Sequence, residues 1–94
     1  MEETIHKYSL PEQDLTTVEM PTGARVLCVQ VRGDKPFLWA IVDPGQPLES
    51  RWFRLCKTGH YLGIDIPSSR YIGTFQLHEG ALVGHVFELE KPPS

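Results

Sequence analysis

Glycine and proline, eight of each in 94 residues, divide this chain into short runs. The runs are rich in Val, Ile, Thr and aromatic residues, which favour β-strands. No segment keeps a helical period of apolar residues over a dozen positions, so long helices are not expected. The sequence therefore predicts an all-β protein of six to seven strands. The candidate strands are 4–10, 16–20, 24–32, 37–43, 50–57, 70–77 and 81–89.

Turn residues and side-chain alternation suggest how the strands are arranged. Residues 33–36 and 78–80 carry turn signals and predict two hairpins. Leu27, Val29 and Val31 alternate on one face of their strand, and 37–43 is apolar on both faces, which is typical of a covered central strand. We expect one antiparallel sheet curled into a small barrel or sandwich, with a single helical turn allowed within 64–70.

Length and charge limit the possible classes of protein. The chain suits a single domain, 1–90, followed by a short flexible tail, 91–94. A sheet this thin leaves a face or edge to cover, so a homo-oligomer is expected. The formal net charge of −3 argues against binding to long nucleic acid, which requires a basic surface. No export signal or membrane-spanning run is present in the sequence, which predicts a cytoplasmic protein without membrane contact.

Catalytic and metal-binding signatures are missing from the sequence. No Gly-x-Ser-x-Gly, P-loop or dinucleotide fingerprint occurs. Cys28 and Cys56 lie among apolar neighbours in strand patterns, so we expect reduced, packed thiols. The four histidines are scattered without ligand spacing. We therefore expect no enzyme activity, no metal and no cofactor.

A cluster of aromatic and basic residues between positions 51 and 71 is the strongest functional signal. Aromatic faces stack on bases, and Arg side chains bind phosphates through paired hydrogen bonds. Two glycines flank the His60–Tyr61 pair, as in a binding loop. The alternative is that Trp52 and Tyr71 are core residues and the arginines a solvated face. The candidate ligand-binding residues are Trp52, Arg54, Thr58, His60, Tyr61, Arg70 and Tyr71.

His85 is expected to behave differently from this cluster. It alternates with Val83 and Phe87, a pattern that predicts the core face of the last strand. A lone histidine among apolar neighbours is usually a hydrogen-bonded core residue. A position lining a pocket is the alternative.

Several short segments resemble a family of short phage-encoded proteins. The segment 37–44, Phe-Leu-Trp-Ala-Ile-Val-Asp-Pro, is similar to the Leu-Trp-Ala-x-Val-Asp segment of that family, and the pieces 52–54, 58–60 and 71–74 with 83–88 follow in the same order. Together they fall within residues 24–90. The resemblance implies a phage origin and a role in the cytoplasm of the infected bacterial host. By analogy of size, it suggests the cyclic-nucleotide sponges that counter bacterial CBASS and Thoeris defences.

The leading hypothesis is therefore a protein that binds and sequesters a small cyclic nucleotide immune messenger without cleaving it. In this hypothesis aromatic residues stack on the bases while Arg54 and Arg70 pair with phosphate oxygens. A protein-binding inhibitor of a host factor, using an edge strand or the Trp52 face, is the second hypothesis. A structural or virion-accessory module is the third.

Overall fold

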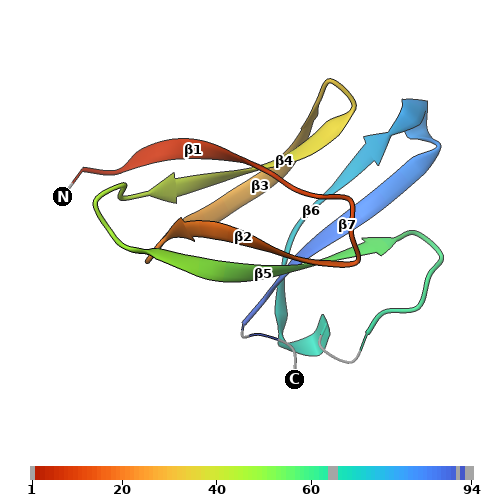
Figure 1. Ribbon diagram of the computed structural model, residues 1–94. Helices are drawn as coiled ribbons and strands as arrows, with labels where there is room; N and C mark the ends of the chain where they lie inside the picture. The colour runs from red at the N-terminus through yellow and green to blue at the C-terminus, as the bar shows by residue number, and fades with distance from the viewer. Residues whose placement is uncertain (1, 64–65, 91, 93–94) are drawn as a thin grey trace.

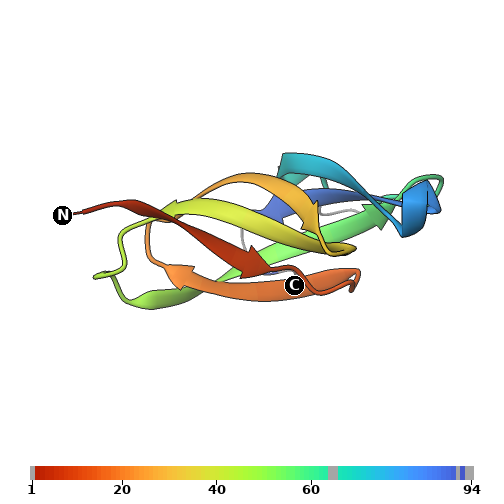
Figure 2. The same cartoon turned by 90° about the horizontal axis from the view of Figure 1, so that it is seen from above.

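Seven antiparallel strands form two sheets that pack as two layers. The computed structural model describes residues 2–63, 66–90 and 92. One sheet has the order β1-β4-β3 and the other β2-β5-β7-β6 (Figures 1 and 2). The strands are β1 (Thr4–Ser9), β2 (Leu15–Pro21), β3 (Arg25–Arg32), β4 (Lys35–Val42), β5 (Leu48–Lys57), β6 (Ser69–Leu77) and β7 (Leu82–Leu89). Single 3-10 turns lie at η1 (Ile66–Ser68) and η2 (His78–Gly80).

The all-β prediction is confirmed, and the form is a sandwich that does not close into a barrel. The strands form two sheets, of three and four strands, and not the single curled sheet expected from the sequence. The expected helical turn is present at η1, although residues 64 and 65 of that segment lie outside the described residues. Apart from Pro92, the same holds for the expected tail, 91–94.

Both predicted hairpins are present, and their tips touch. Gly33 and Asp34 join β3 to β4 with φ of 58° and 60°, the backbone that a two-residue turn of the I′ type requires. His78 and Glu79, between β6 and β7, also have positive φ. The Asp34 carboxylate accepts a hydrogen bond from the His78 backbone N–H at 2.8 Å and lies 2.7 Å from His78 Nδ1. This contact joins the end of one sheet to the end of the other.

The hydrophobic core lies between the two sheets. Met20, Val26, Leu38, Ala40 and Val86 have no exposed surface, and they come from β2, β3, β4 and β7. Both sheets therefore turn one apolar face inward, as the period-two alternation of strands requires.

A β-bulge changes the predicted faces of β3. The pairing with β4 shifts between Val26 and Cys28, so Leu27 is the extra residue. As a result Val26 and Val29 point into the core, whereas Leu27 is 39% exposed. The expected apolar face of Leu27, Val29 and Val31 is thus wrong at its first member, because a bulge shifts the alternation by one residue.

Strand β4 is central in its sheet, but its outer side is not covered. Leu38, Ala40 and Val42 are buried, while Phe37, Trp39 and Ile41 on the opposite face are only partly buried. No strand or 3-10 turn among the described residues packs over this outer face. The expectation of a strand covered on both faces is therefore wrong for this part of the chain.

Hydrogen bonds from two arginines join the two sheets, and a glycine allows β6 to lie close to β3. Arg51 Nη1 donates a hydrogen bond to the Ala24 carbonyl, and Arg70 Nη2 donates one to the Val26 carbonyl, each at 2.8 Å. A Cβ atom on Gly73 would lie only 2.9 Å from Val29 Cγ1. The missing side chain at Gly73 therefore allows β6 to approach β3 this closely.

Candidate functional site

The outer face of the four-stranded sheet carries two neighbouring rows of side chains. Strand pairing places Arg54 beside Phe87 and Phe87 beside Tyr71. The next row contains Cys56, His85 and Thr74. Trp52 shares the outward side of β5, and Thr58 follows the end of that strand. We call this surface the aromatic-histidine face; its residues are Trp52, Arg54, Thr58, Tyr71, Thr74, His85 and Phe87.

A second β-bulge brings Tyr71 and Thr74 to the same side. The pairing of β6 with β7 shifts between Tyr71 and Gly73, so Ile72 is the extra residue and is buried. Residues three apart in a regular strand point to opposite faces. Here the bulge allows the Tyr71 hydroxyl to hydrogen-bond the Thr74 hydroxyl at 2.5 Å.

His85 lies at the centre of a chain of hydroxyl groups. Its Nδ1 is 2.9 Å from Thr74 Oγ1, and its Nε2 is 2.7 Å from Thr58 Oγ1. Both ring nitrogens therefore have hydroxyl partners, which fixes the orientation of the ring. Side chains from β5, β6 and β7 are joined in this way across the sheet.

The predicted core position of His85 is wrong. On β7 the core-facing residues are Gly84 and Val86, and the face with Val83, His85 and Phe87 is only partly buried. Every residue from Leu82 to Leu89 except His85 and Glu88 is apolar or glycine, so the alternation fits either phase. The expectation that His85 is hydrogen-bonded is correct, although its partners are surface hydroxyls.

Aromatic rings lie beside Arg54 on this face. Tyr71 and Phe87 have ring centroids 5.5 Å apart and planes tilted by 58°, a favourable edge-to-face geometry. Tyr71 is 56% exposed, so part of its ring is open to solvent. Trp52 and Arg54 are partly buried. The alternative that Trp52 and Tyr71 are core residues does not hold for Tyr71.

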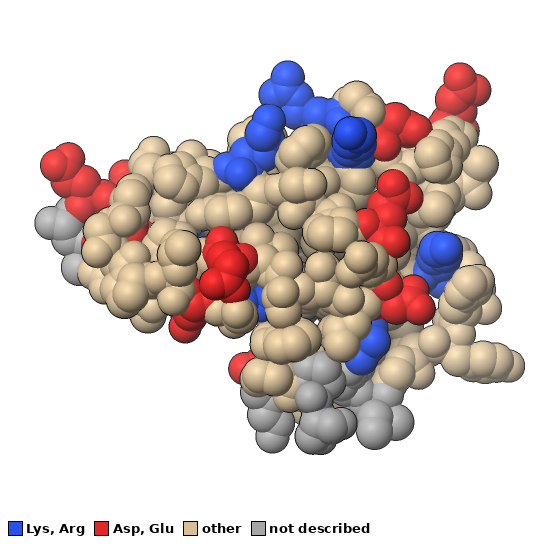
Figure 3. All heavy atoms as spheres, in the orientation of Figure 1, with Lys and Arg blue, Asp and Glu red and all other residues tan. Residues whose placement is uncertain are grey.

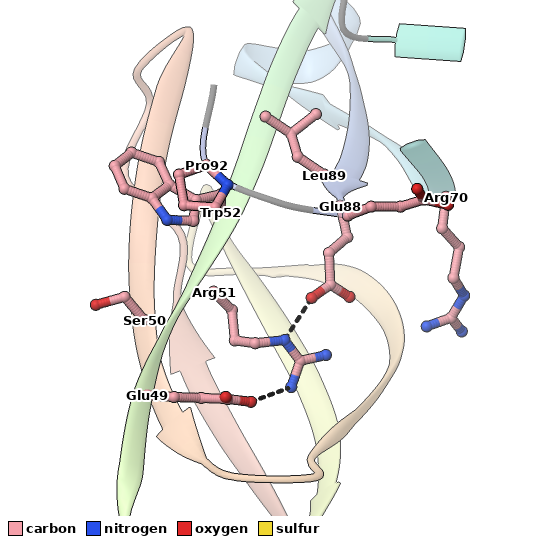
Figure 4. A pocket seen from close by; sticks show the side chains of 9 residues that line it. Glu49, Ser50, Arg51, Trp52, Arg70, Glu88, Leu89 and Pro92 are labelled. Carbon is pink, nitrogen blue, oxygen red and sulfur yellow. Dashed lines mark hydrogen bonds and ion pairs between the residues drawn. The ribbon is translucent and has the colours of Figure 1, made fainter. Parts of the chain in front are cut away.

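A hollow of about 460 Å³ opens at the end of the same sheet, beside Trp52. Arg51 and Glu88 form an ion pair inside it, with 2.6 Å between Arg51 Nε and Glu88 Oε2 (Figure 4). Glu49 lies 3.8 Å from Arg51 Nη1. Arg51 and Glu88 thus neutralise each other, and the hollow offers little net charge to a ligand.

Arg70 and Arg54, both predicted from the sequence to bind phosphate, lie on different faces of the sheet. Arg70 pairs with Glu88 in the strand register, whereas Arg54 pairs with Phe87, so their side chains point to opposite faces of the sheet. The Arg70 guanidinium contacts the Val26 carbonyl at the junction of the two sheets. Only Arg54 of this pair lies on the aromatic-histidine face.

His60 and Tyr61 lie in the loop that follows β5. The His60 backbone N–H bonds the Lys57 carbonyl at 3.1 Å, in a turn where Gly59 has a φ of 89°. The Tyr61 side chain is fully exposed. The loop prediction is therefore confirmed, but neither side chain contacts the aromatic-histidine face within the described part of the chain.

Side chains that could bind a metal are dispersed over the described part of the chain. In the ranges 2–63, 66–90 and 92, no three His, Cys, Asp or Glu side chains gather as a metal site would require. Cys56 is buried and Cys28 partly buried, and neither is in a disulfide. Within the same ranges, no helix has the length and apolar character needed to cross a membrane.

Comparison with known proteins identifies the family but no characterised relative. The whole chain, residues 1–94, matches the family model described as a domain of unknown function, DUF7352, and the chain belongs to that family. No curated protein and no solved structure matches it.

Proposed function

We propose that this member of the DUF7352 family binds a small nucleotide-class ligand on the aromatic-histidine face and holds it without converting it. One observation carries the proposal. Four of the predicted ligand-binding residues, Trp52, Arg54 and Thr58 on β5 and at its end and Tyr71 on β6, share one open sheet face with His85 and Phe87 of β7.

The row Arg54–Phe87–Tyr71 has the dimensions of such a ligand. Neighbouring strands lie about 4.8 Å apart, so the row extends about 10 Å from a cation to an exposed ring. A base can stack on Tyr71 while a phosphate approaches Arg54. Hydroxyl groups of Thr58 and Thr74, oriented by His85, supply hydrogen bonds along the neighbouring row.

A cyclic nucleotide is the ligand that we favour, because it combines rings and phosphates in a compact body. The sequence resemblance to phage-encoded proteins supports sequestration of an immune messenger in the infected cell as the biological role. An open sheet face covers only one side of a ligand, whereas tight binding requires a preorganised site. A second copy of the chain would cover the other side, so we propose a homo-oligomer.

The test is thermal stability with a panel of cyclic di- and trinucleotides and cyclic ADP-ribose variants. A ligand that binds only the native state raises Tm once its concentration exceeds Kd. We expect a rise with at least one compound, and recovery of that compound unchanged after heating. A chemically altered product would contradict binding without conversion, and no rise with any compound would contradict the nucleotide class.

Matched variants locate the site. Arg54→Ala should weaken binding of the active compound by about tenfold or more, since a phosphate contact of about 1.4 kcal/mol corresponds to that factor. Arg32→Ala, which removes the same kind of side chain from the other sheet, should not change Kd. If Arg54→Ala is unfolded, Tyr71→Leu keeps the apolar contact with Phe87 and should still weaken binding. Equal effects of Arg32→Ala and Tyr71→Leu would contradict the site.

A further inference from the structure

The outer face of the three-stranded sheet carries an uncovered apolar stripe. Phe37, Trp39 and Ile41 follow one another along the outward side of β4 and are only partly buried. Ile5 on β1 lies opposite Ile41 and is 56% exposed. The β3 bulge adds Leu27 to this side. Apolar side chains that no other element covers make this face a candidate interaction site.

Four cations surround the stripe. Lys7 lies opposite Trp39, Arg25 opposite Ile41, and Arg32 and Lys35 oppose each other at the hairpin end. All four are exposed, and none has a carboxylate partner among residues 2–63, 66–90 and 92. The outward positions of β1, β3 and β4 contain no Asp or Glu. Figure 3 shows Lys and Arg atoms gathered along the upper edge, where Figure 1 places β1 and the β3–β4 hairpin.

The charge pattern opposes a symmetric contact between two copies. A two-fold interface places a patch against the same patch of its partner. Here four unpaired cations would face four others, which costs free energy in a site from which water is removed. The chain as a whole carries a formal net charge of −3, so this positively charged face has the opposite sign from the protein as a whole. The pattern suits an acidic partner.

The aromatic groups do not offer a surface for stacked bases. Lys7 Nζ lies 4.7 Å from the centre of the Phe37 ring, so the cation occupies one side of that ring. The rest of the stripe includes the aliphatic residues Ile5, Leu27 and Ile41, which suit apolar side chains better than bases. Single-stranded nucleic acid typically binds exposed aromatic platforms within a strongly positive groove.

We propose that the outer face of the β1-β4-β3 sheet docks an acidic polypeptide segment that presents apolar side chains and carboxylates together on one face. The apolar side chains would cover Trp39 and Ile41, and the carboxylates would meet Lys7, Arg25 and the hairpin cations. Attraction between opposite charges selects the partner and speeds association, and burial of the apolar stripe supplies affinity. This surface is on the opposite side of the sandwich from the aromatic-histidine face, so one chain can hold a small ligand and a protein at the same time.

The experiment measures the fluorescence anisotropy of a labelled peptide with the repeat Glu-Glu-Leu-Leu, which presents both residue types on each face when extended, as the full chain is added. The comparison probes are a Lys-Leu peptide of equal length and an oligothymidylate. We expect the acidic peptide to bind with an affinity that falls as salt rises. Stronger binding of the oligothymidylate, or no binding of the acidic peptide up to its solubility limit, would overturn the proposal.

Two lysine variants make the test specific. Lys7→Glu reverses a charge on the proposed surface, and Lys57→Glu reverses an exposed charge at the end of β5 in the other sheet. Lys7→Glu should raise the peptide Kd about tenfold, and Lys57→Glu should leave it within about twofold. Equal changes of the peptide Kd in the two variants would overturn the proposal. The proposal would also be overturned if the unliganded chain formed a dimer and Lys7→Glu dissociated it, because the face would then be an interface between copies. Nucleotide binding should be unchanged in Lys7→Glu, so failure here is distinguishable from failure of the proposed ligand site.

Discussion

Replacing Arg51 with Met should destabilise the protein strongly, because Arg51 connects the two sheets. Its Nε lies 2.6 Å from Glu88 Oε2 and its Nη1 donates to the Ala24 carbonyl at 2.8 Å. The Arg51 side chain is 18% exposed and that of Glu88 11%. Arg51→Met therefore leaves a carboxylate and a carbonyl without their donor in a poorly hydrated place.

The expected loss follows from the burial of this pair. Removing one partner of a fully buried pair costs about 3–5 kcal/mol, and the remaining exposure lowers this to about 2–4 kcal/mol. A domain of this size changes Tm by about 4–8 °C per kcal/mol, so Tm should fall by about 8–32 °C. Urea unfolding followed by tryptophan fluorescence gives the free energy directly.

Two controls separate the ion pair from general charge loss. Glu49 lies farther from Arg51, at 3.8 Å, and is 43% exposed, so Glu49→Gln should cost less than about 1 kcal/mol. Combining Arg51→Met with Glu88→Leu removes both charges and should cost less than the sum of the two single changes. A loss below about 1 kcal/mol for Arg51→Met, or simple additivity in the double variant, would refute the reasoning.

Three smaller perturbations test other contacts. Gly84→Ala should lower the unfolding free energy by about 1–3 kcal/mol, because the added Cβ would lie 2.6 Å from Phe75 Cζ. The same change in a Phe75→Leu background should cost less, and equal costs in the two backgrounds would contradict the explanation. Thr74→Val should lower the unfolding free energy by about 1 kcal/mol and shift the ring resonances of His85 in NMR spectra, because the ring loses one hydroxyl partner. Unchanged His85 resonances would contradict that contact. His78→Ala removes the exposed side-chain contact between the hairpin tips and should change the unfolding free energy by less than about 1 kcal/mol, so a larger loss would mean that the tips determine the packing of the sheets.

The strand content was predictable because its signals are local. Gly33 and Asp34 between two apolar runs specify a two-residue hairpin, and the structure has that turn. The number of strands follows from the same alternation of apolar runs and turn residues. The division into two sheets was not predictable in this way, because it depends on contacts between segments distant in the sequence, such as those of Arg51 with Ala24 and Arg70 with Val26.

The candidate site was only partly predictable, and the two β-bulges explain much of the difference. A bulge changes the direction of every later side chain without leaving a hydrophobic signal of its own. The bulge at Leu27 moves an apolar residue outward, and the bulge at Ile72 brings Tyr71 and Thr74 together. His85 was assigned to the core because the alternation of β7 fits both phases. Arg54 and Tyr71, predicted from their residue types as ligand-binding residues, lie on one face of the sheet, and their binding of a ligand stays a prediction.

The most direct measurement of the proposed function is a ¹H–¹⁵N correlation spectrum recorded while a cyclic nucleotide from the panel is added. The proposal predicts that the shifted amides cluster on β5, β6 and β7, around Arg54, Tyr71 and His85, while those of β1, β3 and β4 stay in place. Shifts concentrated on β1, β3 and β4, or unchanged spectra with every nucleotide of the panel, would contradict a nucleotide site on the four-stranded sheet.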